Sequence, residues 1–132
     1  MGRGADCRDI CTEVDSPAFR LICDMGAPLF VGNDSLETLD DMAQYVAHVH
    51  VKNARLLGAD EHVERYRDSA AGQRYTGTVL DGGVLDLARV LAELERRGYS
   101  GYLQTEYQGE DDPRKALSHN VEYLRRLIDG GL

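Results

Sequence analysis

This sequence has few positively charged side chains relative to negatively charged ones: 15 Lys and Arg against 23 Asp and Glu. The formal net charge of −8 and the sequence pI of about 4.9 argue against a nucleic-acid-binding protein, because phosphates favour basic surfaces. They argue equally against binding to an anionic membrane surface. An anionic small substrate would need local cations, such as Lys52 or a bound metal ion.

Paired cysteines and long apolar runs are also missing. The three cysteines, Cys7, Cys11 and Cys23, form an odd number without the spacing of a secreted disulfide scaffold. We interpret them as reduced, buried thiols; the alternative is a metal site of two cysteines and a histidine. No apolar run approaches the roughly 18 residues of a membrane span, and the stretch MGRGADCRD has no apolar signal-peptide core. We therefore expect a cytoplasmic protein without a membrane partner.

What the sequence does contain is an alternation of strand-like and helical segments, with 42% hydrophobic residues available for a core. This alternation indicates right-handed βαβ units and a parallel α/β sheet within a single domain, residues 1–132. The expected strands are residues 19–24, 47–53 and 101–107, and the expected helices are the end of one near 9–17, then 34–46, 86–97 and 113–129.

Helix starts are marked by residues that accept hydrogen bonds from free backbone N–H groups. Asp34 and Asp86 fit the N-cap position, and Asp112 precedes Pro113, a favoured first helical residue. The last helix is expected to bury five apolar side chains along one face: Ala116, Leu117, Val121, Leu124 and Ile128.

Residues 54–80 are rich in charge and poor in apolar side chains, particularly in the run ADEHVERYRD. We expect this segment to be mostly a long, mobile surface loop.

The stretch VAHVHVKNARLL, residues 46–57, raises the question of function. Its β-branched residues alternate with others, so that His48, His50 and Lys52 share one face of the expected strand. A strand on the protein surface could carry two histidines and a lysine on one face without any function. A strand that ends at a metal or anion site would use these side chains to bind the ion. His48 lies one layer below His50, and we interpret it as a hydrogen-bonded core histidine.

The three expected strands end in residues suited to bind a cation. Asp24 ends the first strand, His50 lies near the end of the second, and Glu106 near the end of the third. Chemistry in parallel α/β sheets gathers at the carboxyl ends of the strands, and neighbouring strands lie about 4.8 Å apart. One imidazole with two carboxylates suits a divalent ion such as Mn²⁺, Mg²⁺, Co²⁺ or Zn²⁺.

Four segments resemble the xylose isomerase-like TIM-barrel superfamily, in particular its sugar phosphate isomerase/epimerase group: RLICDMG, HVHVKNA, LDGGVLDLARVLAELERRGYSGYLQTEY and DDPRKALSHNVEYLR. Together they cover about residues 10–128. The resemblance implies the last three β/α units of an eight-stranded barrel, hence a partial (β/α)8 TIM barrel. It assigns metal binding to Asp24, His50 and Glu106, and a substrate-facing position to Lys52.

The resemblance further implies a divalent-metal-dependent sugar or sugar-phosphate isomerase or epimerase. A proton would move through an enediolate whose oxygens the metal holds, with Glu106 as both ligand and catalytic base. Relatives on the same scaffold also carry out dehydration and cleavage of abasic DNA, but the acidic charge of this chain disfavours a DNA substrate.

The chain departs from the family pattern in three ways. Three strands cannot close a barrel, the strand carrying the fourth metal ligand (a Glu) is absent, and Ala27 and Asn53 replace the usual polar partners. We therefore expect that the chain needs a partner chain or self-association to complete the barrel. The alternative is a catalytically incomplete fragment or assembly module.

The remaining histidines are expected to have no functional role. His62 lies in the charged segment, with a substrate-side role as the alternative, and His119 lies on the last helix, where we expect it to be solvated.

Overall fold

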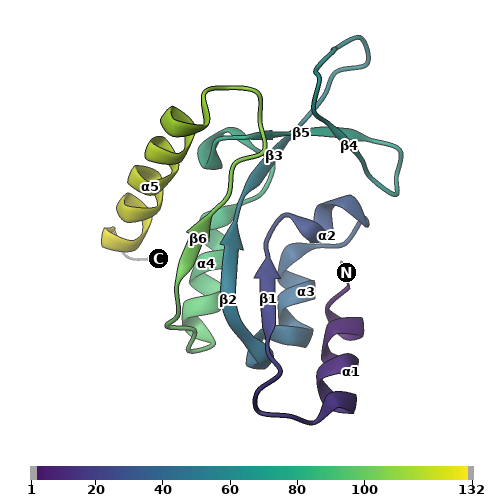
Figure 1. Cartoon of the computed structure of the whole chain (residues 1–132), viewed down its shortest axis with the longest axis vertical. Helices are drawn as coiled ribbons and strands as arrows, with labels where there is room; N and C mark the ends of the chain where they lie inside the picture. The colour runs from purple at the N-terminus through teal and green to yellow at the C-terminus, as the bar shows by residue number, and fades with distance from the viewer. Residues whose placement is uncertain (1–2, 131–132) are drawn as a thin grey trace.

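The computed structural model describes residues 3–130, which form two small sheets with helices packed around one of them (Figure 1). The elements follow the order α1 (Gly4–Val14), β1 (Leu21–Asp24), α2 (Ala27–Phe30), α3 (Ser35–Met42), η1 (Ala43–Tyr45), β2 (Val46–Val51), β3 (Asn53–Leu56), β4 (Arg67–Asp68), β5 (Arg74–Thr78), η2 (Leu80–Gly82), α4 (Leu87–Arg96), β6 (Leu103–Thr105) and α5 (Pro113–Asp129).

The first sheet is parallel and has the strand order β1–β2–β6. Its register sets Asp24 beside His50, and His50 beside Gln104. The strands therefore end at the same edge, as the alternation of strands and helices predicts. The sheet is not closed, and the predicted partial barrel architecture is confirmed.

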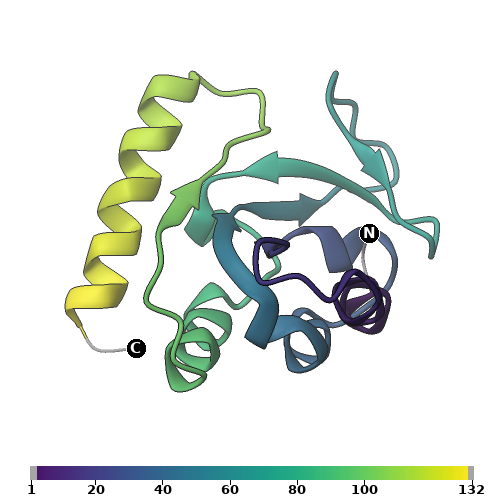
Figure 2. The ribbon, with the colours of Figure 1, turned by 60° about the horizontal axis from the view of Figure 1, so that its bottom comes forward.

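An apolar layer fills the space between this sheet and helices α3 and α4, which lie behind the strands in Figure 1 and beneath them in Figure 2. Val49 and Val51 are fully buried on this face of β2. Their partners include Leu39 on α3 and Leu91 on α4, at 1% and 2% exposure. The odd-numbered positions of β2 therefore build the core, and the even-numbered positions face the opposite side.

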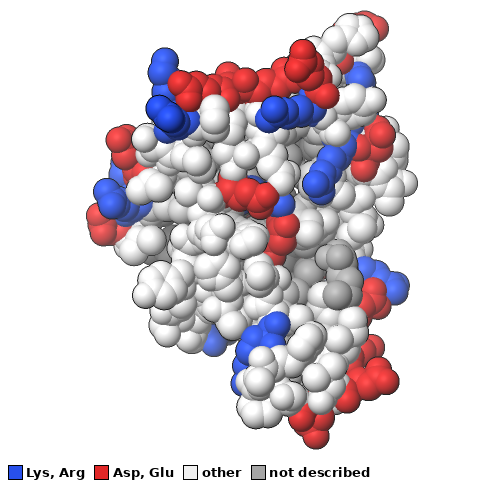
Figure 3. Space-filling model, in the orientation of Figure 1, with Lys and Arg blue, Asp and Glu red and all other residues white. Residues whose placement is uncertain are grey.

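That opposite side of the sheet is open in the described part of the chain. Ile22 on β1 is 57% exposed, and Gln104 on β6 is exposed as well. Figure 3 shows this face largely without charge over the strands, with acidic and basic atoms gathered near the carboxyl ends of β2 and β6. In a closed barrel this face would be the interior.

Three carboxylates cap the helices in the predicted way. The side chain of Asp34 accepts hydrogen bonds from the backbone N–H groups of Leu36 and Glu37, at the start of α3. Asp86 caps α4 and Asp112 caps α5, each through one backbone N–H. Gly98, with a φ of +81°, follows α4 in the left-handed conformation that glycine tolerates.

Residues 54–80, expected to be mostly a long surface loop, contain a sheet that the sequence analysis did not predict. Strands β3, β5 and β4 form a second, antiparallel sheet there, which we call the arm (residues 53–78). The arm crosses above the ends of the parallel strands in Figure 1. The expected strand 47–53 therefore divides: β2 ends at Val51, and Asn53 begins β3 in the other sheet.

Two smaller expectations are also corrected. Val121 and Ile128 on α5 are 37% and 51% exposed, because α5 buries a narrower face through Ala116, Asn120 and Leu124. The expected helix over residues 34–46 ends at Met42 and continues as the short helix η1, so that Val46 begins strand β2. Within the described residues, no helix is long and apolar enough to cross a membrane.

Candidate functional site

Backbone hydrogen bonds between neighbouring strands position the predicted site residues. The N–H of Met25 donates to the carbonyl of His50 at 3.1 Å, and the N–H of Glu106 donates to the carbonyl of Val51 at 2.9 Å. These bonds extend the parallel ladder just beyond β1 and β6. As a result, Asp24 and Glu106 reach the same edge of the sheet from either side of β2.

Lys52 joins the two carboxylates. Its Nζ lies 2.7 Å from Oδ2 of Asp24 and 3.1 Å from Oε2 of Glu106, and its side chain is only 10% exposed. Nδ1 of His50 lies 3.9 Å from the same Glu106 oxygen. We call these four residues the carboxylate–lysine cluster. The sequence predicted that Asp24, His50 and Glu106 converge, but not that Lys52 would bridge the two acids.

The remaining carboxylate oxygens also have donors. The backbone N–H of Gly26 donates to Oδ1 of Asp24 at 3.0 Å, and the side-chain amide of Gln108 donates to Oε1 of Glu106 at 2.6 Å. A Cβ on Gly26 would lie 3.0 Å from the side chain of Lys52, so a residue without a side chain lets the lysine lie flat there. Both acids are thus held in defined orientations.

The donor set of this cluster suits a divalent cation, since it offers two carboxylates and one imidazole. The ammonium of Lys52 marks the point between the acids where positive charge is most stabilised. Within residues 3–130, however, no three His, Cys, Asp or Glu side chains are grouped as metal ligands. An ion between the acids would have to displace the ammonium, so the assignment of the metal to Asp24, His50 and Glu106 stays a prediction.

A second polar contact lies one layer deeper on the open face. Nε2 of His48 is 3.0 Å from Oε1 of Gln104, and the rings of His48 and His50 meet edge to face with centroids 5.3 Å apart. His48 is therefore hydrogen-bonded, as expected, but only half-buried because nothing in the described chain covers this face.

Asn53 has a structural role at the junction of the two sheets. Its Nδ2 donates to the carbonyls of Leu80 and Leu85 at 2.7 and 3.1 Å, and its Oδ1 accepts from the N–H groups of Ala54 and Leu85 at 2.9 and 3.0 Å. Asn53 is 4% exposed. An Asp could not donate the first two bonds, which explains why an amide suits this position.

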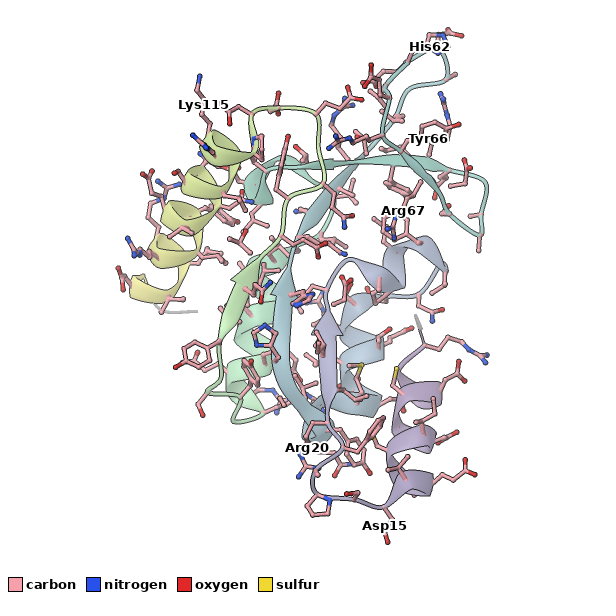
Figure 4. All side chains as sticks on the ribbon, in the orientation of Figure 1. Asp15, Arg20, His62, Tyr66, Arg67 and Lys115 are labelled. Atoms are coloured by element: carbon pink, nitrogen blue, oxygen red, sulfur yellow. The ribbon has the colours of Figure 1, made fainter. Side chains whose placement is uncertain are left out.

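The other candidates lie outside the cluster. His62 is exposed near the tip of the arm, as Figure 4 shows. His119, which we expected to be solvated, is 2.7 Å from Asp81 and lowers the pKa of that carboxyl by hydrogen bonding. All three cysteines are free and buried, as predicted, and burial together with the nearby charge of Asp24 raises the pKa of Cys23 to about 12.

Sequence reasoning missed a pocket of about 330 Å³ beside the cluster, between α2 and the arm. Arg65, Tyr66 and Arg67 line it, and so do Lys52, Gly26 and Gln108, which contact the two acids. Because residues 54–80 were expected to be a loop, the arginines of the arm had no predicted position. The strand-like run RYTGT (74–78) was the available signal that a sheet forms there.

A parallel sheet between helices, with acids, an imidazole and a lysine at its carboxyl edge, defines part of a (β/α) barrel with a polar site at the usual end. The chain belongs to the xylose isomerase-like TIM barrel family, whose model matches residues 1–127. This confirms the resemblance that the sequence motifs indicated.

The chain is similar to proteins named inosose dehydratase. It is 31% identical to the one from Geobacillus thermodenitrificans over 112 residues, which is 84% of this chain and 36% of that protein. It is 28% identical to the one from Lacticaseibacillus casei over 121 residues, which is 88% of this chain and 40% of that protein. The chain thus spans well under half the length of these relatives.

Two solved structures share the fold. A xylose isomerase domain protein from Planctomyces limnophilus superposes with a TM-score of 0.71 at 23% identity, over 96% of this chain and 42% of that one. A xylose isomerase-like TIM barrel protein from Mycobacterium smegmatis, in complex with magnesium, superposes with a TM-score of 0.73 at 21% identity. The match covers 96% of this chain and 40% of that one.

Proposed function

We propose that this chain supplies part of the active site of an enzyme that moves a proton next to the carbonyl of a polyhydroxy compound, as a sugar or sugar-phosphate isomerase or epimerase does. The observation that carries this proposal is the convergence of Asp24, His50, Lys52 and Glu106 at the carboxyl edge of the sheet. Dehydration next to a carbonyl begins with the same proton removal. The names of the relatives are therefore consistent with the same first step.

Glu106 is the proposed base. Its Oε1 is held by Gln108, so the orientation of the carboxylate is fixed before substrate arrives. Its Oε2 faces Lys52 and His50, and this oxygen would accept the proton from the carbon beside the carbonyl.

Lys52 is the proposed electrophile. Its ammonium carries three donors, two of which are directed to Asp24 and Glu106. The third can donate to the substrate carbonyl oxygen and stabilise the negative charge that develops there as the proton leaves. Burial of the lysine strengthens this interaction, because little water competes for the charge.

A divalent ion such as Mn²⁺, Mg²⁺, Co²⁺ or Zn²⁺ is the proposed cofactor, and Asp24, His50 and Glu106 would hold it. When bound, the ion would replace the Lys52 ammonium between the two acids and would supply Lewis acidity toward the substrate oxygens in its place.

The open face of the sheet supports the proposal that a partner chain or a second copy of this chain completes the barrel. Parallel sheets are normally covered on both faces. Within the described residues, one of the two faces of this sheet is uncovered. The same observation favours a second candidate function, an assembly module whose cluster is structural and whose catalytic groups belong to another polypeptide.

Titration of the full chain with Mn²⁺ in a calorimeter, with the oligomeric state recorded, tests the proposal. We expect stoichiometric binding that is lost in Asp24→Ala and in His50→Ala. The control His62→Ala removes an exposed histidine at the tip of the arm and should bind like the original chain. Lys52→Met should tighten binding, because it removes the ammonium that competes for the two carboxylates.

A folded chain that binds no Mn²⁺, or binds it equally in Asp24→Ala and His62→Ala, would overturn the metal-dependent proposal and leave the assembly module. Circular dichroism of each variant separates loss of the ligand from loss of the fold.

A further inference from the structure

The pocket between α2 and the arm has features of a built ligand site. Its volume of about 330 Å³ lies within the range of small-molecule pockets. Three of its lining residues, Gly26, Lys52 and Gln108, also contact the acids of the carboxylate–lysine cluster. A molecule in this pocket would therefore lie directly beside Asp24 and Glu106.

The far wall of the pocket is cationic, although the chain as a whole is acidic. Arg65 and Arg67 both line it, and within the described residues neither guanidinium has an ion-pair partner. By contrast, Arg55 and Arg74 in the same arm are engaged, with the carboxylate of Glu61 and with backbone carbonyls respectively. Two guanidiniums without acceptors are therefore available to a ligand.

Glu64 is the acidic residue that lines the same pocket, and the nearby carboxylate of Glu110 is bound by the backbone N–H groups of Glu64 and Arg65. With Lys52 occupied by its two acids, the arginines outnumber the carboxylate at the wall. The side chains that line the pocket therefore carry more positive than negative charge. In the neighbouring cluster, the ammonium of Lys52 neutralises part of the charge of the two acids.

Aromatic rings hold one of these arginines in place. Cζ of Arg67 lies 5.5 Å from the ring centroid of Phe30, and Phe30 meets Tyr75 edge to face at 6.2 Å. Figure 4 shows the Arg67 side chain in the space between the arm and α2, and Tyr66 on the arm above it. A cation–π contact of this kind leaves the N–H groups of the guanidinium free to bind an anion in two-point fashion.

We propose that this pocket, which we call the arm pocket, binds the anionic substituent of the substrate, a phosphate or a carboxylate, through Arg65 and Arg67. The inference rests on the proposed function, because it places the carbonyl end of the same molecule at Glu106 and Lys52. It narrows the substrate class to polyhydroxy carbonyl compounds that carry one negative group. A phosphate and a carboxylate share the chemistry that two guanidiniums recognise.

The test compares neutral and anionic sugars by NMR-detected titration of the full chain, in the presence of a chelator so that no metal contributes. The probes are glucose, glucose 6-phosphate and glucuronate, with inorganic phosphate alone as a fourth ligand. We expect at least one anionic sugar to bind about tenfold more tightly than glucose, and to shift the amide signals of Phe30 and residues 65–67. The anionic sugar that binds more tightly than glucose shows whether the pocket recognises a phosphate or a carboxylate.

The variants Arg65→Gln and Arg67→Gln should each remove most of this preference, whereas Arg125→Gln, on the exposed surface of α5, should keep it. Arg65 makes no side-chain contact that the fold requires, so its variant keeps the test valid if loss of the Arg67–Phe30 stack unfolds the arm.

Equal binding of glucose and both anionic sugars, or no binding of any, would overturn the inference. So would an anion preference that Arg125→Gln reduces as much as Arg67→Gln does, because that pattern reports net charge alone. Failure of Mn²⁺ to bind at Asp24 and His50 would leave this anion preference unaffected, so the two proposals fail separately.

Discussion

The parallel sheet and the arm are stabilised by different interactions. The sheet packs on an apolar cluster that includes Val49, Val51, Leu39 and Leu91, and no member of that cluster lies between residues 53 and 78. The arm buries fewer apolar side chains, Ala54, Leu57 and Tyr75, and these lie outside that cluster. Polar contacts also hold it: Arg74 donates to three backbone carbonyls, and Thr76 donates to the carbonyl of Arg65 at 2.7 Å.

This difference matches the chemistry that each region carries. The apolar layer makes the sheet a rigid base, which suits a cluster of acids and a lysine that must keep their geometry. A segment with few apolar contacts opens locally at lower free energy, which suits residues that admit and release a ligand. The cluster lies on the rigid region, and the arginines of the arm pocket on the region expected to open.

Asn53 connects the two regions, so its replacement should have the largest effect. Asn53→Asp removes two donated hydrogen bonds and sets a carboxylate against the carbonyls of Leu80 and Leu85. Because the residue is buried, we expect a loss of about 4 kcal/mol in the free energy of unfolding. Urea denaturation followed by circular dichroism measures this loss.

The matched control is Gln44→Glu, which makes the same amide-to-carboxylate change at an exposed position. A similar loss in both variants would show that added negative charge, and not the junction, is responsible.

A pair of leucine truncations compares a buried position in the apolar layer of the sheet with an exposed position in the arm. Leu91→Ala, in the apolar layer at 2% exposure, should cost about 3 kcal/mol, because it leaves a cavity against the sheet. Leu56→Ala, in β3 of the arm at 46% exposure, should cost less than about 0.5 kcal/mol. Thermal and urea unfolding of the two variants measure both values, and equal losses would contradict the contrast between sheet and arm.

The same contrast explains which parts of the fold could be predicted from sequence. The strands of the parallel sheet were predictable because Val49 and Val51 are buried, which leaves a clear two-residue period. The arm was not, because its buried strand residues are adjacent in sequence, Asn53 with Ala54 and Tyr75 with Thr76, so no two-residue period appears. Gly77 interrupts the strand-like run at β5, and a Cβ there would lie 2.4 Å from the backbone of Gln108, so glycine is required by close packing.

The site divides in the same way. The convergence of Asp24, His50 and Glu106 followed from parallel strands ending at one edge, and needed only the topology. The bridge through Lys52 depends on side-chain reach across two neighbouring strands, which sequence spacing does not specify. The arm pocket depends on contacts between Phe30 and Arg67, residues 37 positions apart, which only the folded arm brings together.

The last predicted effect is confined to the arm. Arg74→Gln removes three charge-assisted hydrogen bonds to the carbonyls of Gly58, Ala59 and Glu61, at 3.0 to 3.2 Å. We expect a cost of about 1 kcal/mol, because the group is only partly buried and water can replace it at those carbonyls. Hydrogen exchange should quicken at β3 and β5, while the amides of β1 and β2 keep their rates.

That pattern follows from the absence of arm residues in the apolar cluster, since opening the arm exposes little of the surface that stabilises the sheet. Arg89→Gln, at an exposed position of α4, provides the control and should leave exchange in both regions unchanged. If Arg74→Gln instead accelerates exchange equally in β1, β2 and β5, then the arm and the sheet unfold as one cooperative unit. In that case the Asn53 junction couples them more strongly than their separate interactions imply, and the arm pocket would be as rigid as the cluster beside it.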